Sequence, residues 1–163
     1  MPEQNADQIA DWNGQGAERW VANQDRLDAM LAVFGQAAME AAAPAQGDHV
    51  LDIGCGAGAS SLALASLVGA GGRVVGLDIS EPLIDRARTL ASPETSVLFR
   101  VADASNAELP EGAFDILFSR FGVMFFDDPA EAFAHMRRAP GRADGSLLSA
   151  GAARSRMIGC VCR

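Results

Sequence analysis

Apolar residues recur with two different periods along the chain, and the change between them predicts the order of its elements. From about residue 19 to 43 they fall at helical spacing, after a polar start over residues 1–18. Residues 44–48 break this pattern. Four short, almost wholly apolar runs then have the length of buried strands, at 49–53, 73–77, 97–101 and 114–119. Helices are expected between and after them, at 59–68, 80–91 and 129–139.

Strands that alternate with helices across short turns indicate a parallel sheet with right-handed crossovers. We therefore predict an α/β fold, a Rossmann-like doubly wound parallel sheet with an N-terminal helical extension. Three regions are expected. They are a helical cap or lid over residues 1–45, a Rossmann-like core over 46–139 and an atypical tail over 140–163.

Composition narrows the class of partner. The 163 residues carry a formal charge of −8, which argues against a surface that neutralises nucleic-acid phosphates. No apolar run approaches the roughly 20 residues of a membrane-spanning helix. Cys55, Cys160 and Cys162 have neither the number for a disulfide framework nor the spacing of a metal site. We expect a cytoplasmic enzyme or binding domain that acts on a small molecule, without nucleic acid, membrane or metal.

A glycine loop, Gly54-Cys55-Gly56-Ala57-Gly58, joins the first expected strand to its helix. In doubly wound sheets the ligand lies beyond the carboxyl ends of the strands, where this loop falls. Glycines allow a tight turn and a close approach of the ligand to the backbone. A turn without a ligand is the alternative, but the strand before the loop and the acid ending the next strand favour a binding site.

Charge distinguishes between two possible cofactors. A dinucleotide would fit G-x-G-x-x-G/A, with Ala59 last, but its pyrophosphate disfavours a nearby carboxylate. S-adenosylmethionine has no phosphate and carries an ammonium and a sulfonium. Asp52, Asp78 and Asp103 lie at the ends of three consecutive expected strands and would suit such a cation. Asp78 is placed to accept from the ribose hydroxyls, and Asp103 from the adenine amino group.

Four segments together resemble the class I S-adenosylmethionine-dependent methyltransferases. They are VLDIGCGAG at 50–58, GLDIS at 76–80, VADA at 101–104 and FDILFSRFG at 114–122, and the resemblance extends over about residues 12–139. The resemblance implies that the glycines pack the methionine part of the cofactor and that residues 119–121 line the methyl-transfer cleft. It also implies a lid that contains Trp12, Arg19 and Trp20. Gln24 would reach inward from this lid. The candidate cofactor residues are Asp52, Gly54, Cys55, Gly56, Gly58, Asp78, Ile79, Asp103, Ala104, Ser119 and Arg120.

The resemblance implies in-line transfer of the sulfonium methyl to a small-molecule acceptor. No residue is identified as a base. His49 is expected at the wrong end of the sheet and His135 on the surface, while Asp127 and Asp128 are expected to cap a helix. Two alternatives stay open: a remnant that only binds the cofactor, and a nicotinamide-dependent oxidoreductase, against which Asp52 and the Asp103-Ala104 pair argue.

The tail departs from the family, whose sheet normally has seven strands. Residues 1–139 carry 20 acids and nine arginines, whereas residues 140–163 carry one acid and four arginines. We expect no strand in this tail, and we hypothesise that a frameshift or truncation replaced the later strands. The fourth strand would then be an exposed apolar edge and methyl transfer would be weak or absent.

Overall fold

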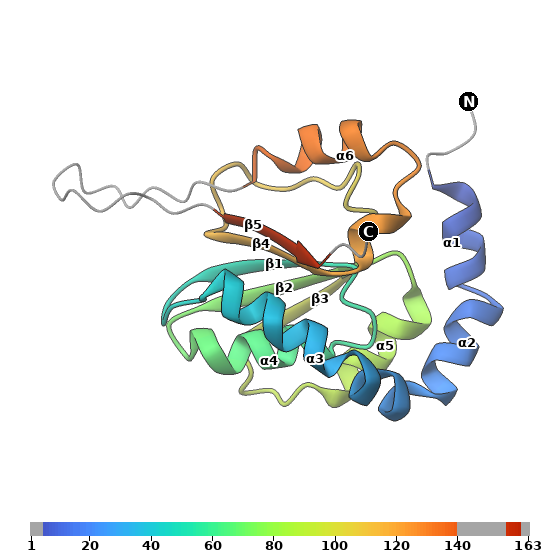
Figure 1. The fold of residues 1–163 in the computed structure, drawn as a ribbon, viewed down its shortest axis with the longest axis horizontal. Helices are drawn as coiled ribbons and strands as arrows, with labels where there is room; N and C mark the ends of the chain where they lie inside the picture. Colours follow the sequence, from blue (N-terminus) through green and yellow to red (C-terminus); the bar gives the residue numbers. More distant parts are fainter. Residues whose placement is uncertain (1–4, 140–155, 161–163) are drawn as a thin grey trace, which may run out of the picture.

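The structure, a computed structural model, describes residues 5–139 and the backbone of residues 156–160. Its centre is a parallel five-stranded sheet in the order β3-β2-β1-β4-β5 (Figure 1). The strands are β1 His49–Ile53, β2 Arg73–Asp78, β3 Val97–Val101, β4 Ile116–Arg120 and β5 Arg156–Cys160. The strand order reverses between β1 and β4, which is where a doubly wound sheet opens a crevice for a ligand.

Helices cover both faces of the sheet, as the apolar strands predict. Three of them, α3 Gln24–Ala42, α4 Ala59–Val68 and α5 Glu81–Leu90, lie on one face, and α6 Pro129–Met136 lies on the other (Figure 1). Alternate strand residues supply the two cores: Val50, Val74 and Phe118 pack with α3 and α4, whereas Leu51 and Leu117 pack with α6. The prediction of a Rossmann-like α/β fold is confirmed.

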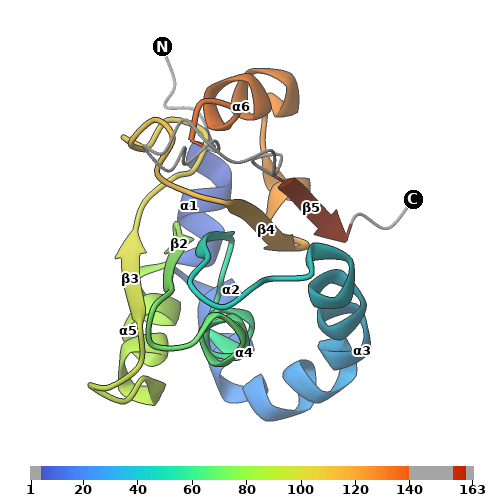
Figure 2. The ribbon, with the colours of Figure 1, turned by 90° about the vertical axis from the view of Figure 1, so that its left-hand side faces the viewer.

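The N-terminal extension has three helices rather than one. Besides α3, it has α1 Ala6–Trp12 and α2 Gln15–Ala22, and both lie beyond the carboxyl ends of the strands (Figures 1 and 2). The single helix predicted for residues 19–43 is therefore wrong. It is broken at Asn23, whose side-chain amide donates to Arg19 O at 2.8 Å. An asparagine that bonds nearby backbone in this way competes with helix continuation.

Two helix starts follow the capping pattern of the sequence. Ser80 Oγ accepts from the amide of Leu83 at the start of α5. Asp128 Oδ1 accepts from the amide of Glu131 at 2.9 Å at the start of α6. The same expectation is wrong for Asp127, whose Oδ2 accepts from the backbone amide of Asn5 at 2.6 Å.

The expectation of a tail without a strand is also wrong. Residues 156–160 form β5, which pairs in parallel with β4 so that Phe118 lies opposite Ile158. In the described part of the chain β4 is thus an inner strand and not an exposed edge. The physical reason is that β4 offers unpaired backbone groups, and Met157 to Cys160 is an apolar run able to pair with them. The rest of the tail lies outside the described residues, and the five described strands are fewer than the seven that the resemblance implies.

Among the described residues, no helix has the length and apolar character needed to cross a membrane.

Candidate functional site

A cavity of about 420 Å³ lies at the carboxyl ends of β1, β2 and β4, under the N-terminal helices. This volume is within the usual range of small-molecule sites. Its two ends differ in chemistry. The polar end holds Asn5, Gln8, Asp78 and Asp103, and the glycine loop forms one wall. The apolar end is lined by Trp20, Leu27, Met30, Leu31, Phe121, Met124 and Phe125.

The glycine loop needs its glycines for different reasons. Gly54 has φ +67°, and a Cβ there would come within 2.5 Å of the Cα of Gly122, so two backbone segments touch. Gly56 has φ +55°, and a Cβ there would meet no atom within 4 Å. Both residues line the cavity. The loop therefore presents open backbone at Gly56, where a ligand can approach without meeting a side chain.

Asp78 ends β2 and fixes this loop. Its Oδ2 accepts from the amide of Gly56 at 2.8 Å, and its Oδ1 accepts from the amide of Ser80 at 2.9 Å. Burial raises the pKa of Asp78, while these amide bonds oppose the rise. The carboxylate lines the cavity next to Ile79. It holds the loop and faces the space where the sequence predicts a ribose.

Asp103 lies at the same end of the cavity, beside Ala104. Its Oδ1 accepts from the amide of Ser105 at 2.8 Å, and its Oδ2 accepts from Nδ2 of Asn5 at 2.6 Å. Asn5 in turn exchanges two hydrogen bonds with Asp127, because its Oδ1 accepts from the amide of Asp127 at 2.8 Å. Sequence reasoning missed Asn5. The sequence offers only a weak signal for such a role, namely a single asparagine near the start of the chain. In the structure Asn5 has a φ of +62°, which asparagine tolerates better than most residues.

Asp52 lies under the glycine loop instead of in the lining of the cavity. Its side chain is fully buried, and its Oδ2 accepts from the hydroxyls of Ser60 and Ser61 at 2.7 Å each. Burial raises the pKa of Asp52 to about 6. The two serine hydroxyls and Arg120 lower this pKa, but their effect is smaller than that of burial. Its Oδ1 has no hydrogen-bond partner among the described residues. The structure thus places this carboxylate against the first turn of α4, behind the wall it was expected to form.

Two other candidates also support the wall from behind. Gly58, the N-cap of α4, lies outside the lining, and a Cβ there would come within 2.8 Å of Phe99 Cζ. Ser119 Oγ donates to Ile53 O at 2.8 Å and accepts from the amide of Val123 at 3.2 Å. Ser119 therefore ties the end of β1 to the 3-10 helix η1, Gly122–Phe125, rather than facing the cavity.

Arg120 lines the cavity at the end of β4. Its Nη2 pairs with Oδ1 of Asp28 on α3 at 3.2 Å. Nε2 of Gln24 donates to the other oxygen of Asp28 at 3.4 Å, and Oε1 of Gln24 accepts from Nε of Arg86 at 3.0 Å. This row of four side chains connects β4, α3 and α5. Gln24 therefore reaches Arg86 and Asp28, not the cavity.

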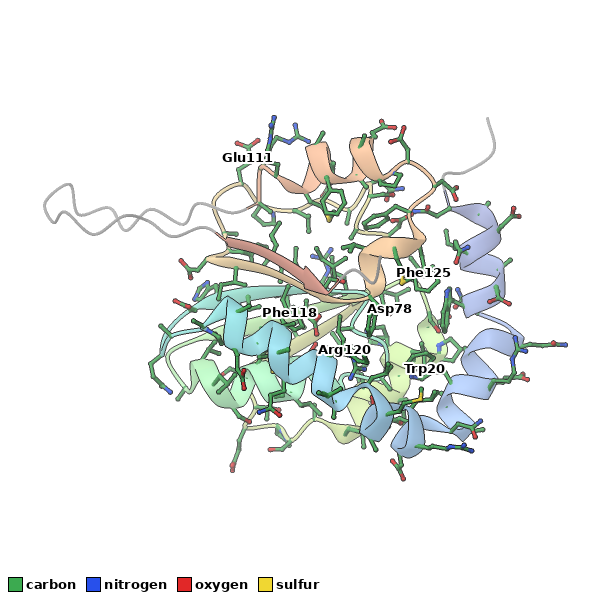
Figure 3. All side chains as sticks on the ribbon, viewed as in Figure 1. Trp20, Asp78, Glu111, Phe118, Arg120 and Phe125 are labelled. Carbon is green, nitrogen blue, oxygen red and sulfur yellow. The ribbon has the colours of Figure 1, made fainter. Side chains whose placement is uncertain are left out.

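Aromatic side chains from the N-terminal helices and η1 line one side of the cavity. Trp12 packs edge-on against Trp20 at 5.7 Å and against Phe125 at 5.8 Å between ring centres. Figure 3 shows Trp20, Asp78, Arg120 and Phe125 gathered between the strand ends and helices α1 and α2. Arg19 lies outside the lining, and its Nε donates to Gln15 O.

The apolar end was not identified from the sequence. Leu27, Met30 and Leu31 have helical spacing, which predicts a helix face packed into a core. Instead they line the cavity, and Met30 is 61% exposed. Met124 and Phe125 belong to η1, which the sequence pattern does not mark as an element. The exposure of a large apolar residue, rather than its spacing, is what marks this surface.

The titratable residues in the described lining are few. They are Cys55, Asp78, Asp103 and Arg120, and the thiol of Cys55 has a pKa raised by its burial. His135 lies outside the lining and is half-buried, with its Nε2 2.7 Å from the carbonyl oxygen of Ala107. It is therefore partly packed against the protein and not simply a surface residue as expected. His49 begins β1, at the end of the strand away from the cavity. The described lining can therefore bind and enclose a ligand, and it holds no histidine to serve as a base.

Known proteins match this chain over the same region. A sequence profile of the methyltransferase domain family matches residues 50–140. Nocamycin O-methyltransferase of Saccharothrix syringae is 38% identical over 105 residues, which are 61% of this chain and 37% of that protein. Aklanonic acid methyltransferase DauC of Streptomyces sp. (strain C5) is 32% identical over 123 residues, which are 74% of this chain and 56% of that protein.

A solved structure agrees. The S-adenosylmethionine-dependent methyltransferase of Mesorhizobium loti superimposes with a TM-score of 0.54 and 29% identity, over 59% of this chain and 43% of that one. The chain thus spans between about a third and somewhat over half of the two curated relatives described above. Because the family profile covers more than half of its residues, the chain belongs to the methyltransferase domain family.

Proposed function

We propose that this domain binds S-adenosylmethionine in the cavity at the strand ends and presents its methyl group to a small-molecule acceptor. The observation that carries the proposal is the pairing of Asp78 with the amide of Gly56. It places a carboxylate beside open glycine backbone at the point where the sheet order reverses. A cationic nucleoside fits this donor and acceptor set better than a pyrophosphate, which the acids would repel.

The residues that would hold the cofactor follow the polar half of the cavity. Gly54, Cys55 and Gly56 would face the methionine part, with Asp78 and Ile79 at the ribose and Asp103 and Ala104 at the adenine. Asp52, Gly58 and Ser119 would act indirectly, since they hold the loop from behind. Trp12 and Trp20 line the cavity, pack against each other and would exclude water from the bound molecule.

When bound, S-adenosylmethionine supplies a methyl group that its sulfonium already activates. The protein then has to align the acceptor with that methyl, and holding two reactants in position can lower a barrier by several kcal/mol. The apolar end of the cavity, next to the glycine loop, is where an acceptor would lie. The names of two relatives mention nocamycin and aklanonic acid, and the acceptor of this chain is proposed only as a small molecule.

Calorimetric titration tests the binding proposal directly. We expect S-adenosylmethionine to bind the chain and NAD to bind at least about tenfold more weakly. Asp78→Ala should reduce the S-adenosylmethionine affinity by about tenfold or more, because it removes both a ligand contact and the support of Gly56. Asp85→Ala is the matched control, since this exposed aspartate lies on α5 in a surface ion pair with Arg88. Equal effects of the two substitutions would contradict the proposal.

A domain that only binds the cofactor is a second candidate. It is favoured by the described lining, whose titratable residues include no histidine, lysine or tyrosine that could deprotonate an acceptor. A labelled-methyl assay with a panel of small acceptors separates the two candidates. Incorporation of label supports transfer, whereas tight cofactor binding with no incorporation across the panel supports binding alone.

A further inference from the structure

The charged side chains that line the cavity differ between its two ends. Asp78 and Asp103 lie at the end assigned above to the cofactor, while the positively charged residue of the described lining is Arg120. Arg120 ends β4 and stands next to Phe121, on the side of the cavity lined by α3 and η1. A cationic ligand part is favoured at the first end and an anionic part at the second. Arg120, a candidate cofactor residue in the sequence, is therefore available to a different part of the bound molecules.

The guanidinium of Arg120 has more hydrogen-bond donors than its ion pair with Asp28 uses. Its side chain is 11% exposed, and among the described residues its one ion pair joins Nη2 to Oδ1 of Asp28 at 3.2 Å. Arginine has five N–H donors in a planar fork, so Nε and Nη1 remain able to bind an oxygen anion. Asp28 also accepts from Gln24, so it is held in place on α3 and keeps the arginine stem fixed against Gly35.

The cavity lining on the side of α3 and η1 is mostly apolar. Leu27, Met30 and Leu31 contribute to it from α3, and Met124 and Phe125 contribute to it from η1. Met30, Met124 and Phe125 are 61%, 52% and 41% exposed and line the same cavity, and grouped exposed apolar residues are typical of a binding groove. Methionine side chains adapt to ligands of different shape. This end of the cavity would hold an apolar ring system or chain much better than a sugar or a peptide.

We propose that the methyl acceptor is an apolar molecule with an acidic oxygen, a carboxylate or an ionised phenol or enol, and that Arg120 binds this oxygen. The inference rests on the proposed function. Transfer to an ionised oxygen forms one C–O bond and breaks one C–S bond, with the bonding pair passing to sulfur. The positive charge of the sulfonium and the negative charge of the acceptor oxygen cancel in the products, and no proton is removed. Such an acceptor needs no base, which agrees with a described lining that holds no histidine.

Binding of model compounds tests this without relying on turnover. The probes are naphthoate with its neutral partner naphthamide, and an ionised nitronaphthol with its neutral methyl ether, each titrated by calorimetry into the chain. We expect at least one anion to bind about tenfold more tightly than its neutral partner, as a charged hydrogen bond provides. Preference for naphthoate indicates a carboxylate acceptor and preference for nitronaphtholate a phenol or enol. No preference in either pair would overturn the proposal.

Variants of the ion pair make the test specific. Arg120→Met keeps the apolar stem and should abolish the preference, whereas Arg88→Met, on the exposed side of α5, should keep it. Asp28→Asn removes the internal competitor for the guanidinium and should increase the preference, a gain that misfolding cannot imitate. An unchanged or smaller preference in Asp28→Asn would contradict the proposal even if Arg120→Met fails to fold. Titration of S-adenosylmethionine itself reports separately on the proposed function.

Discussion

The amide of Gly56 and the carboxylate of Asp78 meet at 2.8 Å, and this contact joins the first two strand ends into one binding wall. Gly56 lies in the loop that follows β1, and Asp78 is the last residue of β2. The β1–β2 register places Ile53 beside Leu77, so the two strands deliver these residues to the same level. The shape of the site thus follows from the pairing of the strands together with the turn at the glycines.

Substitutions at the two glycines should separate folding from binding. Gly54→Ala combines a positive φ with a Cβ 2.5 Å from backbone, whereas Gly56→Ala has the positive φ without a clash. A left-handed alanine costs roughly 1–2 kcal/mol, so Gly56→Ala should lower the melting temperature modestly and Gly54→Ala clearly more. Gly56→Ala should also weaken S-adenosylmethionine binding, because its methyl occupies the open face. Thermal unfolding and calorimetry check both effects, and equal melting temperatures would contradict the packing argument.

Buried Asp52 should make the stability of the cofactor-free chain depend on pH. Its folded pKa of about 6 lies above the ordinary 3.8, so the folded state binds more protons than the unfolded state between these values. Stability therefore falls as pH rises from about 4 to about 6, by an amount on the order of a few kcal/mol, and stays lower above that range. Asp52→Asn cannot ionise and should lose this part of the pH dependence.

Urea unfolding at several pH values from 4 to 8 provides the measurement. The quantity to compare is the difference in unfolding free energy between the wild type and Asp52→Asn, because Asp78 also titrates with a raised pKa. Asp85→Asn is the control for the substitution itself, since that aspartate is exposed on α5 in a surface ion pair with Arg88. A wild-type profile parallel to that of Asp52→Asn would show that Asp52 does not ionise in this way.

Asn5 should stabilise the end of the cavity that contains Asp103, although the two residues are far apart in the sequence. It bonds Asp103 at 2.6 Å and Asp127 at 2.6 and 2.8 Å, and it is itself buried. Asn5→Ala removes the side-chain bonds and should destabilise the chain by about 1–3 kcal/mol. Hydrogen exchange should then rise around residues 103–107 and 127–128. Asn106→Ala, at an exposed position of the same loop, is expected to change neither quantity.

The sequence predicted the layered fold and the polar half of the site because both depend on local signals. The glycine loop, Asp78 and Asp103 directly follow apolar strands, and strand ends meet at one edge of a parallel sheet. Asp52 is the instructive exception. It also lies in a strand, but its side chain points to the α4 face, where Ser60 and Ser61 bond it. Position along the chain did not reveal which side of the wall it occupies.

The apolar half could not be predicted because it depends on contacts between distant segments. Met30 and Leu31 have the spacing of a core helix, and only the placement of α3 across the strand ends turns them toward a cavity. Asn5 likewise acts through partners 98 and 122 residues away. β5 lies in the tail, where the change of charge suggested no strand, and it pairs with β4, which is about 40 residues earlier in the sequence. Long-range pairing of this kind leaves little trace in local periodicity.

Gln24 should hold α3 in place over the cavity. It is 7% exposed, its Oε1 accepts from Nε of Arg86 at 3.0 Å, and its Nε2 donates to Asp28 at 3.4 Å. Gln24→Leu removes both bonds and should destabilise the chain by roughly 1–2 kcal/mol, with faster hydrogen exchange in the first turns of α3. Gln36→Leu is the matched control on the same helix, because Gln36 is exposed and bonds Glu40 at the surface. Similar losses in the two variants, measured by urea unfolding, would mean that the row from Arg86 to Arg120 does not fix the helix.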